Sequence, residues 1–102
     1  MKIKALIKKP EDLYGHMTYI ENNLETMQKI VEGYIEVTGI DNLVIICNEE
    51  GKLRGLDHNI LLGHDQLVGT IIICGASGDE FADIPITADQ WKHMMEHDLR
   101  IF

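Results

Sequence analysis

Two segments of the chain, 43–47 and 67–75, have apolar side chains at almost every position. Their sequences are LVIIC and LVGTIIICG, so neither shows the polar and apolar alternation of a strand with one wet face. Strands that are apolar on both sides lie inside a sheet whose two faces are both covered. This feature restricts the chain to folds in which other elements pack on both faces of a sheet.

The length of 102 residues suits one hydrophobic core, and we expect a single domain over 1–102. No run approaches the roughly twenty apolar residues of a membrane-spanning helix, so we expect no membrane interaction. Cys47 and Cys74 lie inside the apolar segments, without a CxxC pair or a signal-like N-terminus. We therefore expect buried, reduced thiols in a cytoplasmic protein, and neither a cofactor nor a metal.

Three further segments alternate like strands with one polar face, at 2–9, 16–21 and 34–40. The lysines of the first segment would protect an exposed sheet edge. After the apolar segment 43–47, Asn48 to Gly51 are predicted to form a type I turn into a hairpin strand at 52–56. The segment 57–65 shows no steady period and is expected to be an irregular connection.

Two segments predict helices. Asn22 would cap the first helix and Gly33 would end it. The C-terminal segment 86–102 begins with a capping box of Thr87 and Gln90 before a helix that buries Trp91, Met94 and Met95. The fold class is therefore α+β, with a mainly antiparallel sheet of four to six strands and two helices. If both helices lay on one face, a partner would have to cover the other, so we predict a homo-oligomer, a dimer or higher.

Seventeen acidic residues against nine basic ones give the chain a net charge of −8. This charge argues against direct binding of nucleic acid, because phosphates would be repelled. It is consistent with simple solubility, and also with an acidic surface that imitates DNA and blocks a DNA-binding protein. The acidic residues are scattered, whereas a DNA mimic would be expected to align them in runs.

Motifs for catalysis are weak. The HMMEH segment at 93–97 matches the pattern of inverted zinc peptidases, but two histidines at this spacing are also typical of a solvated helix face. His58 and His64 lie in a polar segment with no fixed geometry. The glycines of CGASGDE, at 74–80, lack the lysine and spacing of a phosphate loop. For an anionic ligand, Arg54 with Lys52 would supply positive charge, and Tyr34 and Tyr19 would supply rings for stacking.

The order of several motifs resembles a small bacterial and phage family of unknown function, DUF3846. The motifs are GYIE at 33–36, CNEEGKL at 47–53 and a GT pair before an apolar strand, and the resemblance covers 23–92. The chain departs from the family at Asp57, where proline is usual, and at Ile60, where a basic residue is common. The resemblance implies a setting in phages, plasmids and integrative elements, where small proteins often counteract host defence.

Three functions follow as hypotheses. The first is a non-enzymatic binding protein of a phage or mobile genetic element that sequesters a small anionic or nucleotide-like signal at a subunit interface. The second is an acidic protein that binds and blocks a host protein, and the third is a small enzyme of unknown activity. The ligand-binding residues expected for the first hypothesis are Tyr34, Glu36, Asn48, Glu49, Arg54 and Asn59.

Overall fold

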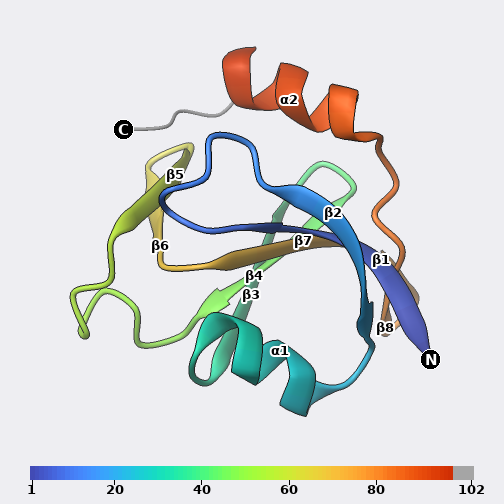
Figure 1. The fold of residues 1–102 in the computed structure, drawn as a ribbon, viewed down its shortest axis with the longest axis horizontal. Coiled ribbons are helices and arrows are strands. Elements are labelled where there is room, and N and C mark those ends of the chain that lie inside the picture. The colour runs from blue at the N-terminus through green and yellow to red at the C-terminus, as the bar shows by residue number, and fades with distance from the viewer. Residues whose placement is uncertain (98–102) are drawn as a thin grey trace.

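The structure is a computed structural model and describes residues 1–97. Its helices and strands are shown in Figure 1. In chain order they are β1 (Lys2–Lys8), β2 (His16–Glu21), α1 (Leu24–Val31), β3 (Ile35–Ile40), β4 (Leu43–Asn48), β5 (His58–Leu62), β6 (Asp65–Val68), β7 (Ile71–Ser77), β8 (Glu80–Ala82) and α2 (Ala88–His97).

The main sheet is antiparallel, which confirms the predicted α+β class. Its strands follow the order β2-β1-β7-β4-β3, and β8 pairs with β7 as a sixth strand. β5 and β6 form a separate two-stranded sheet. The order places β4 and β7 inside the sheet, as their continuous apolar sequences require.

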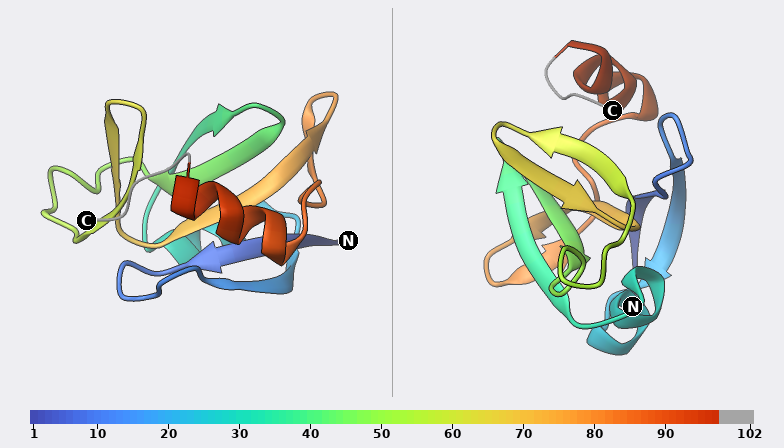
Figure 2. Two further views of the ribbon diagram at one scale, coloured as in Figure 1. Left: turned by 90° about the horizontal axis from the view of Figure 1, so that it is seen from above. Right: turned by 90° about the vertical axis from the view of Figure 1, so that its left-hand side faces the viewer.

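Each face of the sheet has its own helix. Figure 1 and the right-hand view of Figure 2 show α1 on one side, and α2 with the β5–β6 hairpin on the other. The consecutive residues Ile45 and Ile46 of β4 are both completely buried, one in the cluster with Trp91 of α2 and the other in the cluster with Met27 of α1. The premise that both helices share one face is therefore wrong, and the predicted homo-oligomer needs a different argument.

Strand β1 is not an edge strand, contrary to the sequence-based expectation. It pairs with β2 on one side and with β7 on the other, so the edges of the main path are β2 and β3. Lys8, expected on a wet face, is completely buried, and its Nζ donates a hydrogen bond to Asn59 Oδ1 at 2.7 Å. The alternation of lysines did not reveal that β5 would cover this end of the strand.

The predicted hairpin strand at 52–56 is wrong. Residues 49–55 form successive turns, in which Arg54 N donates to Glu50 O at 2.9 Å and Leu56 N donates to Gly51 O at 3.0 Å. The segment 57–65, expected to be an irregular connection, contains β5. The apolar segment 67–75 is divided between β6 and β7 at Gly69, where φ is +74°. Local hydrogen bonds and a positive φ at glycine set these boundaries, and the pattern of hydrophobic residues alone does not predict them.

The helix ends are partly as predicted. The N-cap of α1 is Asn23 rather than Asn22, because the Asn23 side chain accepts a hydrogen bond from Thr26 N at 2.8 Å. The capping box of α2 is confirmed by two reciprocal bonds between Thr87 and Gln90, of 2.8 and 3.1 Å. Trp91 of α2 is completely buried, as expected. Residues 98–102 of the predicted C-terminal segment lie outside the described residues.

Candidate functional site

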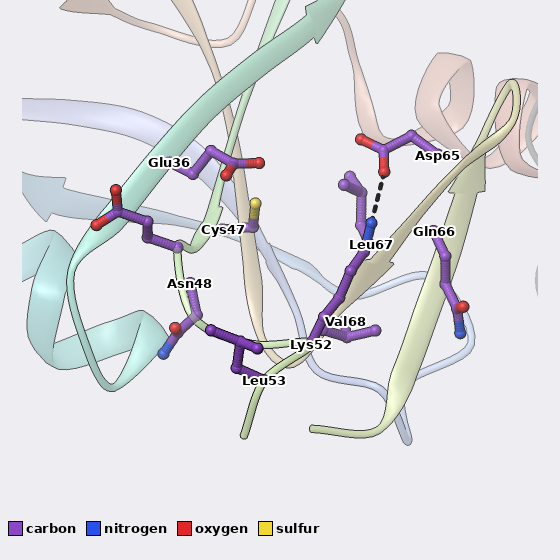
Figure 3. Close-up of a pocket in the computed structure, with 10 residues that line it drawn as sticks. Glu36, Cys47, Asn48, Lys52, Leu53, Asp65, Gln66, Leu67 and Val68 are labelled. Atoms are coloured by element: carbon purple, nitrogen blue, oxygen red, sulfur yellow. Dashed lines mark hydrogen bonds and ion pairs between the residues drawn. The ribbon is translucent and has the colours of Figure 1, made fainter. Parts of the chain in front are cut away.

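A pocket of about 100 Å³ lies where the end of β4 and the turns after it meet β3 and β6. Figure 3 shows its side chains. Three strands and one run of turns contribute to it, and its lining residues are Glu36, Cys47, Asn48, Glu49, Lys52, Leu53, Asp65, Gln66, Leu67 and Val68. The sequence positions span 33 residues from first to last, so the tertiary fold assembles this site.

Carboxylates dominate the charge of this pocket. Glu36 of β3 is the register partner of Cys47 in β4, and Figure 3 shows its carboxylate beside the thiol. On the other side, Asp65 Oδ1 accepts a hydrogen bond from Lys52 Nζ at 2.9 Å. This bond to Asp65 raises the pKa of the Lys52 ammonium. With Glu49 also in the lining, three acidic side chains face one lysine that is already paired.

The Cys47 thiol in the pocket is protonated at neutral pH. Burial, followed by the nearby charges of Glu36 and Asp65, raises its pKa to about 11. A nucleophilic cysteine needs the opposite shift, toward the thiolate, usually from a cation or a helix N-terminus. Histidine is absent from the described residues that line the pocket, so no imidazole lies there to act as a base. The arrangement does not activate Cys47 as a nucleophile.

Four of the six predicted ligand-binding residues come together: Asn48, whose side chain is buried, and three exposed residues. Glu36 and Glu49 both line the pocket, and Tyr34 is joined to Glu49 because the Glu49 N–H donates to Tyr34 O at 2.8 Å. All three residues are exposed, and Tyr34 retains 65% of its accessible surface. This half of the predicted site is accessible, but it is acidic and aromatic rather than cationic.

Asn48, which lines the pocket, and Arg54, which does not, both support the end of α1. The Asn48 side chain is buried and donates to Val31 O at 3.0 Å, while its Oδ1 accepts from Glu50 N at 2.8 Å. Arg54 Nη1 donates to Glu32 O at 2.7 Å. Carbonyls in the last turn of a helix have no partner within the helix, so these side chains satisfy them. Asn48 and Arg54 therefore have a structural explanation.

Asn59 does not belong to the pocket. It is completely buried, accepts a hydrogen bond from Lys8 Nζ, and donates from Nδ2 to Lys8 O at 2.9 Å and to Gly69 O at 2.8 Å. These three bonds connect β5 with the end of β1 and with the turn between β6 and β7. These bonds explain why a polar residue lies at this position in the core.

The sequence did not indicate that Cys47, Leu53 and Asp65 line the pocket, and it placed Lys52 beside Arg54 rather than beside Asp65. Their proximity depends on the β5–β6 hairpin folding back toward β4, and the first strand of that hairpin, β5, lies in the segment predicted to be irregular. No local signal marked Leu53, because the segment 52–56 was predicted to be a hairpin strand. Leu53 is 90% exposed at the pocket, more than any other large hydrophobic side chain among the described residues.

The histidine motifs do not form a metal site in the part of the chain that the structure describes. The rings of His93 and His97 lie 4.2 Å apart on exposed turns of α2. His58 Nδ1 lies 2.9 Å from Gln66 Nε2 across the β5–β6 hairpin. Over residues 1–97, no three His, Cys, Asp or Glu side chains are grouped closely enough to hold an ion.

Comparison with known families identifies the relatives of this chain. A family model described as a domain of unknown function (DUF3846) matches residues 1–96. The chain belongs to this family. No curated protein and no solved structure gave a significant match. The DUF3846 membership confirms the resemblance seen in the sequence motifs.

Two of the motifs that suggested DUF3846 are adjacent in the fold. The GYIE segment leads into β3, and the CNEEGKL segment contains the end of β4 and the turns that follow. Ile35 pairs with Asn48 and Glu36 pairs with Cys47, so the two motifs form one continuous piece of antiparallel ladder. Together they build most of the acidic side of the pocket. Neither described helix of this DUF3846 protein has the length and hydropathy needed to cross a membrane.

Proposed function

We propose that the protein is a non-enzymatic binding protein of a phage or mobile genetic element, that it acts in the host cytoplasm, and that its target is a host protein. The observation that carries this proposal is the acidic mouth of the pocket beside the exposed Leu53. Negative charge around an exposed apolar side chain complements a basic protein surface with an apolar contact at its centre. Blocking such a surface requires binding and no chemical step.

A small anionic ligand is less well supported, although the sequence alone favoured it. Its recognition needs cations that are free to contact it, whereas Lys52 is paired with Asp65 and Arg54 donates to Glu32 O. The pocket of about 100 Å³ is also smaller than the roughly 300–1,000 Å³ of ordinary small-molecule sites. A wider hollow of about 300 Å³ elsewhere contains Glu11, Glu32 and Asp57 beside the single cation Lys9.

The test is a comparison of two charge-reversal variants. Glu36→Lys with Glu49→Lys changes the pocket mouth, while Asp79→Lys with Glu80→Lys makes the same charge change at the β7–β8 turn, where both residues are exposed. Each immobilised protein is exposed to host extract at moderate salt, and retained proteins are quantified by mass spectrometry. We expect at least one host protein to be retained by wild type and by the β7–β8 variant but not by the pocket variant. The binding of that host protein to purified wild type should weaken as the salt concentration rises.

A thermal-shift screen with linear and cyclic nucleotides supplies the opposing outcome. A ligand that binds the folded state raises its melting temperature by mass action. We expect no shift with any nucleotide. A nucleotide that stabilises wild type, together with equal retention of host proteins by both charge-reversal variants, would overturn the protein-target proposal.

A further inference from the structure

Strand β3 forms an edge of the main sheet that carries one charged residue, Glu36, and lacks the lysine, proline and bulge that often protect such an edge. It has no second neighbour among the strands of residues 1–97. All six of its residues pair with β4 in an uninterrupted register, and its sequence IEVTGI contains neither lysine nor proline. Natural edge strands commonly use charges, proline or bulges to prevent further pairing. Val37, at the middle of β3, is 50% exposed.

We propose that β3 pairs antiparallel with β3 of a second copy of this chain, about a two-fold axis at Val37. The two-residue turn Asp41–Asn42 makes Ile40 and Leu43 a hydrogen-bonded pair with β4. Because backbone direction alternates along a strand, the N–H and C=O groups of Ile35, Val37 and Gly39 point away from β4. In the dimer, Val37 bonds to Val37 of the second copy, and Ile35 bonds to its Gly39.

Charge and burial select this register over its neighbours. Glu36 is the single charged residue of β3. An axis at Glu36 would place two carboxylates directly opposite each other, which destabilises a strand pair. An axis at Thr38 would place Glu36 against Ile40. An axis at Val37 places Glu36 opposite Thr38 and packs the two half-exposed valines side by side, which removes apolar surface from water.

Pairing of β3 with β3 of a second copy also limits the assembly to two copies. A contact between β3 of one copy and the other edge strand, β2, of the next would be head-to-tail and would leave free edges for further addition. A two-fold contact uses the same surface on both copies and ends at a dimer. The shared edge is short and each copy carries a net charge of −8, so we expect a weak dimer that strengthens as salt screens the repulsion.

The first test measures mass by analytical ultracentrifugation over a wide range of protein and salt concentration. Wild type is expected to become dimeric as both rise. Val37→Lys should be monomeric, because two ammonium groups would face each other at the axis. This variant reduces the net negative charge, so its loss of association cannot come from general repulsion. Tyr19→Lys makes the same charge change on β2, where Tyr19 is 62% exposed, and should dimerise like wild type.

The second test fixes the register by cross-linking. Directly opposite residues of a hydrogen-bonded antiparallel pair have Cα atoms about 5.5 Å apart, within the range of a disulfide. Under mild oxidation, Val37→Cys should form a covalent dimer on a non-reducing gel, whereas Tyr19→Cys should not; the native Cys47 and Cys74 are buried. Circular dichroism checks that each variant is folded.

Three results would overturn the proposal. They are a wild type that remains monomeric at its highest soluble concentration, a dimer that persists in Val37→Lys, and a dimer that forms without the Val37→Cys cross-link. The dimer is measured without any host protein. Its failure would therefore leave the proposed target binding untouched.

Discussion

Asn59 shows how a polar residue that looks like a ligand contact becomes part of the core. Its amide satisfies the carbonyls of Lys8 and Gly69, and its Oδ1 is the 2.7 Å partner of the buried Lys8 ammonium. Burial lowers the pKa of Lys8, since a charged group loses hydration there. The side chain therefore offsets three desolvation penalties at once.

Replacing Asn59 should be among the most damaging single changes in this chain. In Asn59→Leu, the Lys8 ammonium keeps only a 3.5 Å contact with Lys9 O, so we expect a loss of about 3 kcal/mol in the free energy of unfolding. Urea denaturation measures this loss. The double variant Lys8→Met with Asn59→Leu should recover part of it, because the charge is then absent. A single variant as stable as wild type would contradict the assignment.

At the scale of one element, the end of α1 depends on two neighbouring residues with different requirements. Glu32 has the left-handed conformation that usually favours glycine, with φ at 64°. Gly33 lies one position later, without a positive φ, and a Cβ there would approach the Asn48 amide nitrogen to 2.6 Å. Gly33 was predicted to end the helix by its backbone freedom; it is needed instead for the close approach of Asn48.

Two substitutions at this helix end should have opposite effects. Glu32→Gly removes the strain of a side chain in the left-handed region and should stabilise the protein by roughly 0.5 to 1 kcal/mol. Gly33→Ala should destabilise it by about 1 kcal/mol, because Asn48 must move away from Val31 O. Thermal denaturation compares them, with Glu32→Ala as the control that retains the strain and should gain nothing. A stabilising Gly33→Ala would refute this explanation.

At the scale of the whole molecule, the two thiols connect folding to pH. Cys74 is completely buried on the α1 face and Cys47 nearly so on the other, and burial is the main cause that raises the pKa of each to about 11 from 9.0. Between pH 9 and about pH 11, the unfolded chain loses thiol protons that the folded chain retains. Stability is therefore unaffected by the thiols below pH 9 and falls as the pH rises toward 11.

We expect the free energy of unfolding to fall by roughly 2 to 3 kcal/mol per thiol across this range, since each pKa unit is worth about 1.4 kcal/mol. Urea denaturation from pH 8 to pH 11 measures the slope. Lys8, whose pKa is lowered in the folded state, acts in the opposite direction below pH 10.5. Cys74→Ala should reduce the fall by about half. An unchanged slope in that variant would show that other groups cause it.

Features that depend on short stretches of chain could be predicted from the amino-acid sequence. Continuous apolar segments fixed β4 and β7 inside the sheet, and the capping box of Thr87 and Gln90 started α2 at its observed position. Even the family could be identified from short motifs, because a motif is a local pattern. These features could be predicted because each depends on residues that are near neighbours in the chain.

Contacts between polar residues that are distant in the sequence became known from the tertiary structure alone. The β5–β6 hairpin brings Asp65 to Lys52 and buries Asn59 against Lys8, and both contacts join positions that no periodicity relates. The tertiary structure also has one helix on each face of the sheet, whereas the sequence allowed both helices to lie on the same face. A local pattern shows that a residue is polar, but whether it binds solvent, a partner or a buried lysine depends on long-range packing. For this reason the six predicted site residues divide into an exposed group of Tyr34, Glu36 and Glu49 and a group that holds the fold together, Asn48, Arg54 and Asn59.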